Sequence, residues 1–418
     1  MPSGRPLVFG HPPGVIPAWR ARVREALTAG ATTPFYLFSP APVAEILQRF
    51  EALNFGRPAT HWYSTKTQPL AAQLRWWRNQ GRPAEVVSES EWRLVRECGF
   101  PVDQVLINGP AKHHWLPAVC ADGMRVNFDS LAELTALLPY ARRHRWRTGL
   151  RLLTAAEFDP EQPDFPTQFG LTPDEAALAL RRLQRAGLTP EVLHFHLRTN
   201  LSDTAAHRQA LAEVAAFCRS VQWWPRCVDV GGGLPPAHTL GRGGRSLSAG
   251  HNPATYEPLA RMMREALGEF SGLEEIWLEN GRAILAGSGV LAVRVLDVKE
   301  RRGVRQLICD GGRTQHALLS VWEQHELVPL AQRRGPVTLT AIHGPTCMAF
   351  DQLTRKPFPR SVRAGDVLLW FEAGAYHLPW ETRFSHGLAE IWWEESPGQF
   401  ERQRGPDPIR PPATPATR

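Results

Sequence analysis

The sequence predicts an α/β protein: a (β/α)8 barrel of the TIM type, followed by a mostly antiparallel β-barrel or sandwich domain. From about residue 35 to 285, short apolar runs alternate with helical patterns, and about eight such units suggest a closed parallel barrel. After about residue 286 the runs are β-rich with turn residues and little helix, which indicates a second domain. A chain of 418 residues is long enough for both.

The elements follow one another along the chain. In the first domain the apolar runs are "PFYLFS" (34–39), "THWYST", "AEVVS", "QVLING", "MRVNFDS", "RTGLRLL", "EVLHFHL", "CVDVGGG" and "EIWLENG". Helical patterns such as "PLAAQLRWWRNQG" and "PDEAALALRRLQRAG" lie between them. In the second domain the runs are "GVLAVRVLDVKE", "VRQLICDGG", "GPVTLTAIHG" and "GDVLLWFEAGAY".

These patterns divide the chain into four segments. Residues 1–34 would form an N-terminal segment that packs with the C-terminal β domain. The barrel would span 35–285 and the β domain 286–400. We expect 401–418 to be a disordered tail, because its end, "GPDPIRPPATPATR", is rich in proline.

Composition excludes several classes of protein. The hydrophobic content is 43 %, and no run approaches the ~20 apolar residues of a membrane helix. The stretch "MPSGRPLVFGHPPG" has no apolar core of a secretory signal, so we expect a cytoplasmic protein with no membrane partner. The net charge of +7 comes from arginines scattered among acids, which argues against a nucleic-acid partner. Six cysteines without CxxC spacing predict free thiols and no bound metal.

Lys66 is unusual in this chain. Lysine and arginine total 48, but only four are lysines: Lys66, Lys112, Lys299 and Lys356. A lysine can lose its proton whereas an arginine stays charged, so a lysine in an arginine-rich chain suggests chemistry at its nitrogen. Lys66 follows a predicted strand, at the end where active sites of barrels form.

Other strand ends carry residues suited to a phosphate or a cofactor. The glycines 231–233 can turn backbone N–H groups toward an anion, and Thr199 and Arg282 can donate to a phosphate. His196 and Glu279 lie at two of the same strand ends. Each feature alone has a structural explanation: a flexible turn, a hydrogen-bonded histidine, or a glutamate paired with an arginine. Their shared position favours one common site.

Taken in order, these segments resemble the fold type III pyridoxal-phosphate decarboxylases, the family of ornithine, diaminopimelate and arginine decarboxylases. "YSTKTQP" resembles that family's Schiff-base lysine motif, with Gln68 in place of Asn. "HFHLRTN" is similar to the His-x-Gly-Ser segment, "VDVGGGLP" to the glycine-rich phosphate loop, and "ENGRAIL" to the Glu-Pro-Gly-Arg segment. In the second domain, "GPTCMAFDQL" and "GDVLLWFEAGAY" resemble the cysteine-bearing loop and the Ala-Gly-Ala-Tyr segment. The resemblance spans roughly 33–395.

The resemblance implies a lyase with pyridoxal 5'-phosphate as its cofactor. Lys66 would hold the cofactor through a Schiff base (the internal aldimine), His196 would stack on the pyridine ring, and Glu279 would keep the ring nitrogen protonated. Cys347 would protonate the quinonoid carbanion after carbon dioxide leaves. The remaining cofactor contacts would come from Thr199, Gly231, Gly232, Gly233, Gly281, Arg282 and Tyr376.

The resemblance also implies a head-to-tail homodimer with shared active sites. In that family the loop that bears the cysteine reaches across the dimer. Cys347 would therefore serve the partner's Lys66.

Departures from the family pattern concern the substrate. Arg198 replaces the Gly of the His-x-Gly-Ser segment, Leu318 stands where diaminopimelate decarboxylases would carry a substrate-binding Arg, and Met348 replaces the acid that reads a distal ammonium. An unpaired buried charge is costly, so diaminopimelate, ornithine and lysine are disfavoured. The expected substrate pocket consists of Arg198, Arg313, Leu318, Trp322, Met348 and Asp351.

We therefore predict an amino-acid substrate whose side chain is apolar, acylated or conjugated, as in siderophore or other natural-product biosynthesis. Arg198 and Arg313 are the candidates for meeting an acidic group on it. In the alternative, Glu323 or Glu372 has taken over the recognition of a distal ammonium.

Three functions are consistent with the sequence. The leading one is a pyridoxal-phosphate-dependent decarboxylase of an amino acid or an amino-acid-derived intermediate. The second is a racemase or epimerase with the same cofactor, because both reactions pass through a stabilised carbanion. The third is a catalytically silent paralogue that binds a partner, against which Lys66 and the phosphate-binding residues argue.

Overall fold

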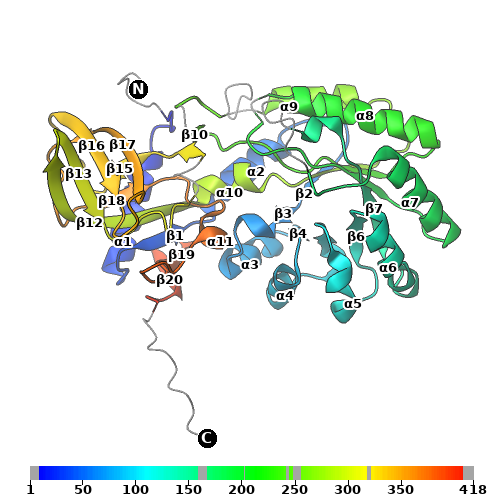
Figure 1. The fold of residues 1–418 in the computed structure, drawn as a ribbon, viewed down its shortest axis with the longest axis horizontal. Helices are drawn as coiled ribbons and strands as arrows, with labels where there is room; N and C mark the ends of the chain where they lie inside the picture. Colours follow the sequence, from blue (N-terminus) through cyan, green and yellow to red (C-terminus); the bar gives the residue numbers. More distant parts are fainter. Residues whose placement is uncertain are drawn as a thin grey trace, which may run out of the picture. The chain divides into compact units, whose positions relative to one another are not determined.

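The computed structural model describes residues 9–158, 167–201, 203–241, 244–247, 256–317 and 322–407. The chain divides into two compact units, whose elements are labelled in Figure 1. The barrel unit comprises Ala44–Ala237 and Leu247–Ile284, and the β unit comprises Met1–Val43, His238–Ser246 and Leu285–Arg418. In the described part of the chain, no helix has the length and apolar character needed to cross a membrane.

The barrel unit is built on a parallel sheet of nine strands in the order β2-β11-β9-β8-β7-β6-β5-β4-β3. The strands are β2 (Ala59–His61), β3 (Tyr63–Ser64), β4 (Ala84–Val86), β5 (Val105–Ile107), β6 (Arg125–Phe128), β7 (Arg147–Arg151), β8 (Val192–His194), β9 (Cys227–Asp229) and β11 (Glu275–Leu278). Because β2 and β3 are two parts of one segment interrupted at Trp62, the two edges of the sheet meet. The sheet closes into a barrel, which confirms the predicted (β/α)8 architecture.

Helices alternate with the barrel strands and lie outside them in Figure 1. They are α2 (Ala41–Glu51), α3 (Ala71–Asn79), α4 (Glu89–Glu97), α5 (Leu116–Val119), α6 (Leu131–Arg143), α7 (Pro173–Arg185), α8 (Ala205–Val221), α9 (Glu257–Ala266) and α10 (Gly281–Leu285). Single 3-10 turns are η1 (Thr65–Thr67), η2 (Val102–Gln104), η3 (Lys112–His114), η4 (Ala155–Glu157) and η5 (Ala286–Ser288).

Local sequence explains where several helices begin. Ser88 and Ser130 each accept a hydrogen bond from the backbone N–H three residues later, which caps α4 and α6. At α7, Thr172 and Glu175 form a reciprocal capping box and Pro173 is the first helical residue. The starts of α4 and α6 follow β4 and β6 within a few residues, so these caps mark where the two strands end.

The β unit is a mostly antiparallel sheet in the order β17-β16-β13-β12-β1-β19-β20, with β18 pairing to both β12 and β15. Its elements are α1 (Val15–Thr28), β1 (Phe35–Phe38), β10 (Leu240–Gly241), β12 (Gly289–Arg301), β13 (Val304–Cys309), β14 (Glu323–Gln324), β15 (Leu327–Pro329), β16 (Val337–His343), β17 (Gln352–Pro359), β18 (Val367–Trp370), α11 (His377–Trp380), β19 (Glu390–Ser396) and β20 (Gln399–Arg404).

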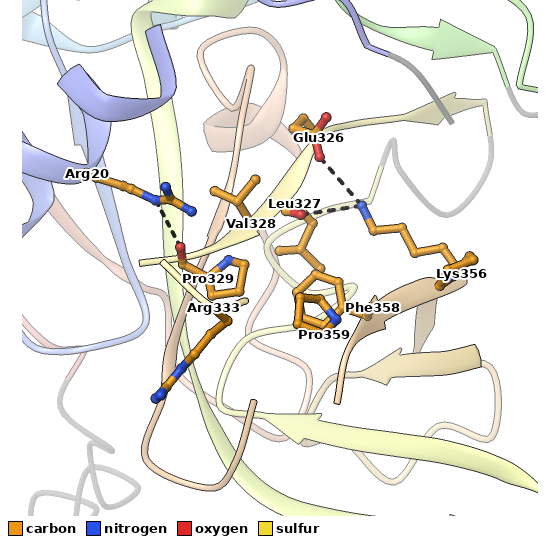
Figure 2. Close-up of a pocket in the computed structure, with 10 residues that line it drawn as sticks. Arg20, Glu326, Leu327, Val328, Pro329, Arg333, Lys356, Phe358 and Pro359 are labelled. Carbon is orange, nitrogen blue, oxygen red and sulfur yellow. Dashed lines mark hydrogen bonds and ion pairs between the residues drawn. The ribbon is translucent and has the colours of Figure 1, made fainter. Parts of the chain in front are cut away.

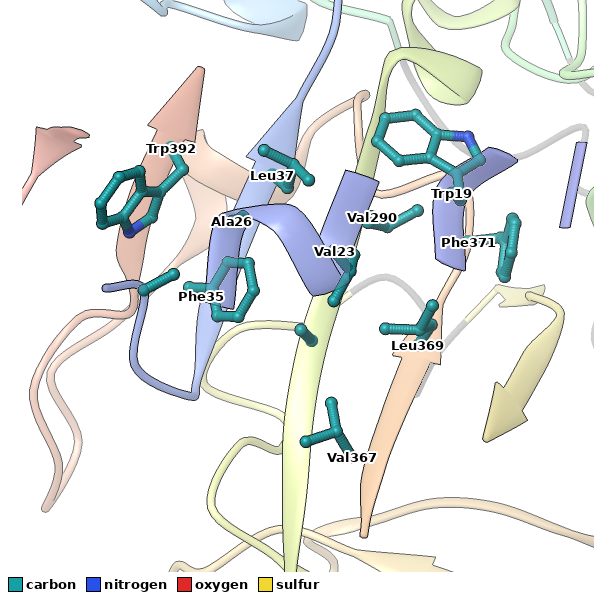
Figure 3. Packing of buried hydrophobic residues seen from close by; sticks show 12 residues of the cluster. Trp19, Val23, Ala26, Phe35, Leu37, Val290, Val367, Leu369, Phe371 and Trp392 are labelled. Atoms are coloured by element: carbon teal, nitrogen blue, oxygen red, sulfur yellow. The ribbon is translucent and has the colours of Figure 1, made fainter. Parts of the chain in front are cut away.

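Helix α1 packs on this sheet (Figure 3). Its buried face presents Trp19, Val23 and Ala26 to a cluster that includes side chains of β1, β12, β18 and β19. Burial of apolar surface contributes roughly 25 cal/mol per Å², so this cluster stabilises the packing of α1 on the sheet. The first described segment of the chain is thus part of the β unit.

Two boundaries differ from the sequence prediction. The run 34–39, which we assigned to the barrel, forms β1, and β1 pairs with β12 and β19 in the β unit. All four residues of β1 are buried, and Phe35 and Leu37 belong to the β unit's own core cluster, so this strand is part of the β unit and not of the barrel. At the other end, residues 401–404, which we assigned to the tail, continue β20 against β19. The rest of the predicted tail from 408 on lies outside the described residues.

Candidate active site

Lys66 lies at the carboxyl end of a barrel strand, on the turn η1 that follows β3. Its Nζ donates to both carboxylate oxygens of Glu85, at 3.0 and 2.9 Å. Glu85 belongs to the adjacent strand β4 and is fully buried, whereas the lysine side chain is 30 % exposed. A buried carboxylate thus holds the ammonium group while the side chain stays accessible.

The other three lysines occupy different settings. Lys112 is completely buried and pairs with Glu133 at 2.7 Å. Lys299 is exposed on β12, and Lys356 lines a cavity of the β unit. All four lysines are described, and only Lys66 combines a barrel strand end with an exposed side chain.

Residues of the same motif hold the turn that carries the lysine. The Tyr63 hydroxyl donates to the backbone oxygen of Gln68 at 2.7 Å and closes the turn. The hydroxyls of Thr65 and Thr67 are buried and have no hydrogen-bond partner among the described residues. A Cβ added to Gly281 would collide with Thr67, so the segment that follows β11 packs directly against the turn.

Glu279 follows β11, and its buried carboxylate is surrounded by donors. Asn108 donates through Nδ2 at 2.5 Å, and His196 Nδ1 lies 3.3 Å away. His194 Nε2 is 3.9 Å away, and neither of its ring nitrogens has a hydrogen-bond partner in the described ranges. The ligand atoms of the two histidines and Glu279 lie within 4.8 Å of one another, so they could also hold a metal ion, which the sequence analysis did not indicate.

Burial and neighbouring charges set the ionisation of this interior. Burial alone would raise the pKa of Glu279, but the hydrogen bond from His196 and the charge of Lys66 bring that pKa below its ordinary value. Burial raises the pKa of Asp229 on β9 well above its ordinary value, and Glu279 raises it further, so Asp229 stays neutral. Burial also lowers the pKa of His194 well below its ordinary value, so that imidazole is neutral. Glu279 therefore keeps its negative charge.

The glycines 231–233 follow β9 and turn beside the same residues. A Cβ on Gly231, whose φ is +64°, would lie 2.6 Å from Nδ1 of His196. A Cβ on Gly232 would lie 2.6 Å from the backbone oxygen of Glu279. The absence of side chains therefore lets the loop backbone approach the site. The Gly231 N–H donates to Asp229 Oδ1 at 3.0 Å, so the N–H groups of Gly232 and Gly233 are the ones that can face an anion.

Arg198 does not join this cluster. Its guanidinium group donates to the backbone oxygens of Ala156 and Phe158, at 3.1 and 3.2 Å. These carbonyls belong to the loop after β7, which Arg198 therefore holds in place.

The other predicted cofactor contacts lie in both units. Thr199 is exposed in the loop after β8, and Arg282 is partly buried on α10 in the barrel unit. Tyr376 is partly buried in the β unit, immediately before α11. Leu318, which we predicted to mark the substrate pocket, lies outside the described residues.

The loop between β16 and β17 carries three of the predicted residues. Cys347 is exposed and Met348 is partly buried. Asp351 is buried and accepts hydrogen bonds from Arg313 N at 2.9 Å and from Thr346 N and Oγ1 at 3.1 and 2.6 Å. Oδ2 of Asp351 thus closes its own loop, and Oδ1 ties that loop to the segment after β13.

The β unit also carries exposed aromatic side chains. Phe350 is 59 % exposed, and the Arg313 guanidinium group stacks over its ring at 5.0 Å. Trp322 is 51 % exposed and packs edge-to-face on Trp380, with ring centroids 5.3 Å apart. These rings offer apolar surface to a ligand or a partner.

The β unit also contains a cavity of about 240 Å³ between β15 and β17 (Figure 2). Arg20 Nε donates to the backbone oxygen of Pro329 at 3.0 Å, and Lys356 Nζ lies 3.4 Å from that of Leu327. Among the described strands, β15 pairs with β18 alone, so these cations satisfy carbonyl groups along the free edge of β15. We interpret the cavity as the space left between the facing edges of β15 and β17.

Sequence analysis missed several polar residues that line the barrel interior. They are Glu85, Asn108, Asn127, His194 and Asp229, all buried. Each lies within or directly after a strand whose other residues are mostly apolar. A polar residue that interrupts an apolar run at a strand end is the signal that could have identified them.

The residues of the barrel unit fit pyridoxal phosphate. The side-chain-free loop at 231–233 offers backbone donors to a phosphate, and Glu279 is an ionised acceptor for a protonated ring nitrogen. The buried hydroxyls of Thr65 and Thr67 lack partners beside the lysine that would bind the aldehyde carbon. An anion cradle, a nitrogen nucleophile and a partner for the ring nitrogen are groups that bind this cofactor in proteins.

Comparison with known proteins gives the same assignment. The family described as "Pyridoxal-dependent decarboxylase, pyridoxal binding domain" matches residues 43–286. A diaminopimelate decarboxylase of Actinosynnema pretiosum subsp. auranticum is 30 % identical over 334 residues, 75 % of this chain and 73 % of that protein. One from Deinococcus radiodurans is 29 % identical over 377 residues, 89 % of this chain and 93 % of that protein.

Solved structures show the same fold. The crystal structure of diaminopimelate decarboxylase from Helicobacter pylori, complexed with L-lysine, superimposes with a TM-score of 0.77 at 20 % sequence identity. The match covers 92 % of this chain and 97 % of that one. Both the barrel and the β unit are therefore shared with this structure.

Proposed function

The chain belongs to the family of pyridoxal-dependent decarboxylases, and from this premise we propose that it decarboxylates an amino acid whose side chain is apolar, acylated or conjugated. The observation that supports catalysis by this chain is the contact between Lys66 Nζ and the buried carboxylate of Glu85, beside the ionised Glu279. A silent paralogue would have no need to keep these charged groups in the barrel interior, since buried charges are costly.

The chain's own residues supply binding, orientation and proton transfer. When bound, pyridoxal phosphate supplies an electron sink for cleavage of the bond to the α-carboxylate. Lys66 Nζ would hold it, and the loop at 231–233 would bind its phosphate through the N–H groups of Gly232 and Gly233. Glu279 would hold a proton at the ring nitrogen, because an ionised carboxylate next to that nitrogen favours its protonated form. Cys347, on the exposed loop between β16 and β17, would give a proton to the α-carbon of the substrate held at the partner's Lys66.

The substrate proposal is supported by the loop that bears the cysteine. A distal ammonium group would need a carboxylate partner, and Met348 offers only a polarizable apolar surface. Asp351 is the nearby acid in the sequence, but its oxygens accept from Arg313 N, Thr346 N and Thr346 Oγ1. The described part of this loop therefore presents no uncommitted carboxylate.

The two acids that could take over this recognition are also engaged. Glu323 is buried and pairs with His325 Nε2 at 2.9 Å. Glu372 is buried and accepts from the backbone N–H of His238 and from the Thr239 hydroxyl. These contacts argue against the alternative in which a free diamine-type amino acid is the substrate.

Diaminopimelate is the second candidate. The curated relatives named above are diaminopimelate decarboxylases, with the one from Actinosynnema at 30 % identity. If the substrate carries a distal amino-acid group, Arg313 or the exposed Trp322 of the β unit would bind that group.

Release of carbon dioxide from a panel of amino acids tests the proposal. The panel pairs lysine, ornithine and diaminopimelate with their side-chain-acylated forms, assayed on the wild type, Met348→Asp and Met348→Leu. We expect the wild type to prefer an acylated form by about 10-fold or more, and Met348→Asp to shift the preference toward the free diamines. Met348→Leu is the control, since it changes the side chain without adding a charge. Efficient turnover of a free diamine or of diaminopimelate by the wild type, with no gain in Met348→Asp, would contradict the substrate class.

A further inference from the structure

Two asparagines in the barrel interior form a chain of hydrogen bonds that ends on Glu279. Asn127 lies on β6 and Asn108 directly follows β5, and their side chains are almost completely buried. Asn127 Nδ2 donates to Asn108 Oδ1 at 2.9 Å. Asn108 Nδ2 in turn donates to Glu279 Oε1 at 2.5 Å.

The direction of this chain is fixed by chemistry. An ionised carboxylate can only accept hydrogen bonds, so Asn108 must present its NH2 group to Glu279. The Asn108 oxygen then faces Asn127, which must donate. The ionised Glu279 therefore selects one of the two orientations of the Asn108 amide, and Asn127 stabilises that orientation by donating to Asn108 Oδ1.

A glycine makes room for this arrangement. Gly149 is the central residue of β7, and a Cβ there would collide with Asn127 Oδ1. Glycine in the middle of a strand weakens it, so its presence usually marks a close approach of another group. Here the approaching group is the amide that begins the chain.

We infer that Asn108, oriented by Asn127, is a positioning residue that fixes the carboxylate of Glu279 for the cofactor's ring nitrogen. The inference rests on the proposed function, because it assigns Glu279 to that nitrogen. With Oε1 held by Asn108, Oε2 is the oxygen that lies 3.3 Å from His196 Nδ1. The amide donor also favours the ionised form of the carboxylate, on which the protonation of the ring nitrogen depends.

Substitutions of Asn108 and Asn127, the two amides of the hydrogen-bond chain, test the inference in the cofactor-loaded protein. Asn108→Ala removes the donor, and Asn108→Leu removes it with similar side-chain volume. We expect kcat to fall about 10- to 100-fold with little change in KM, since a hydrogen bond to a charged group contributes on that scale. We also expect the pH at which the absorbance of the bound cofactor changes to shift by about one unit or more. Gln73→Ala is the control, because Gln73 is a buried amide on α3 outside the barrel interior.

A double-mutant cycle tells whether Asn108 and Asn127 act on Glu279 through one chain of hydrogen bonds or have two independent structural roles. Asn127→Ala should shift the cofactor spectrum in the same direction as Asn108→Ala but by a smaller amount, because Asn127 acts through Asn108. Adding Asn127→Ala to Asn108→Ala should have no further effect on the spectrum or on kcat. Gly149→Ala should reproduce the Asn127→Ala shift, because it displaces that side chain without removing a polar atom.

The outcomes also separate this inference from the proposed function. If the wild type binds pyridoxal phosphate and releases carbon dioxide while folded Asn108→Ala and Asn108→Leu keep the wild-type spectrum and kcat, the positioning role is wrong and the proposed function stands. Additive effects of the two asparagines would likewise overturn the chain of contacts. If the wild type neither binds the cofactor nor releases carbon dioxide, both the proposed function and the inference fail.

Discussion

The Nζ atom of Lys66 lies within 3.0 Å of both carboxylate oxygens of Glu85, a residue with no solvent-exposed side-chain surface. Ser64, two residues before the lysine, donates to the same carboxylate at 2.8 Å. Glu85 on β4 thus orients the Nζ atom of Lys66, which follows the neighbouring strand β3.

Replacing Lys66 should abolish covalent attachment of the cofactor. In Lys66→Ala the fold should remain, since the side chain lies on a turn and is partly exposed. Borohydride reduction of the wild type, followed by peptide mass spectrometry, should place the cofactor adduct on Lys66. Lys299→Ala is the matched control, because that lysine is exposed on β12. An adduct on Lys112, Lys299 or Lys356 would overturn the assignment.

Replacing Glu85 should slow catalysis without loss of the lysine. In Glu85→Gln the amide keeps the side-chain volume but loses the charge that faces Lys66 Nζ, so we expect kcat to fall by at least about 10-fold. Stopped-flow absorbance should show slower capture of added pyridoxal phosphate. Ser64→Ala removes only the 2.8 Å hydrogen bond to Glu85 and should have a smaller effect. Equal rates in Glu85→Gln and the wild type would show that this carboxylate does not assist the lysine.

The stability of the protein should depend on pH through Glu91, at the start of α4. Burial and the nearby Glu85 raise the pKa of Glu91 from 4.5 to about 7. Below pH 4.5 the carboxyl group is protonated in both the folded and the unfolded chain and has no effect. Between pH 4.5 and 7 the unfolded chain loses the proton first, so the free energy of unfolding falls as pH rises, by at most about 3 kcal/mol, and stays lower above pH 7.

Glu91→Gln should remove this contribution. The amide can still accept the hydrogen bond from Val87 N, so the start of the helix is preserved. We expect the variant to be more stable than the wild type at pH 8 and equally stable near pH 4.5, as measured by urea unfolding. Glu97→Gln, at an exposed position of the same helix, is the control. A variant that is no more stable at pH 8 would argue against a strongly shifted Glu91.

Removing the thiol of Cys347 should impair the last proton transfer. In Cys347→Ala we expect slower product formation, or loss of stereospecific incorporation of deuterium at the α-carbon, because the proton would then come from water. Cys120→Ala is a control, since that cysteine lies in the barrel unit and is only partly buried. Unchanged kinetics and stereochemistry would assign Cys347 a structural role and favour the racemase alternative.

Mixed dimers test the proposed sharing of active sites. Lys66→Ala and Cys347→Ala are each expected to be weakly active or inactive as homodimers. If Cys347 serves the partner's Lys66, a hybrid of the two variants contains one intact site and should regain about a quarter to a half of the wild-type rate per dimer, an order-of-magnitude expectation from one site in two. Hybrids that form but remain inactive would contradict the shared site.

The sequence by itself determined the two-domain architecture and the ends of the strands that carry the site. Alternating apolar runs and helical patterns have the periods that parallel sheets and their covering helices impose, so they can be read without a structure. The rare Lys66, the glycines 231–233 and Glu279 were identified for a similar reason. Each is a residue type whose chemistry differs from that of its surroundings.

Only the tertiary structure decided which residues meet. The run at 35–38 has the pattern of any buried strand, and its partners β12 and β19 lie more than 250 residues away in the chain, so no local signal could assign it to the β unit. Arg198 and Asp351 stand at motif positions, but the structure engages them in hydrogen bonds with Ala156 and Arg313, which lie 42 and 38 residues away in the chain. Asn108 and Asn127 become partners of Glu279 only because closing the barrel turns the interior sides of β5, β6 and β11 toward one axis. Local periodicity specifies which element forms, whereas the pairing of buried polar groups depends on contacts between distant segments, which no local pattern encodes.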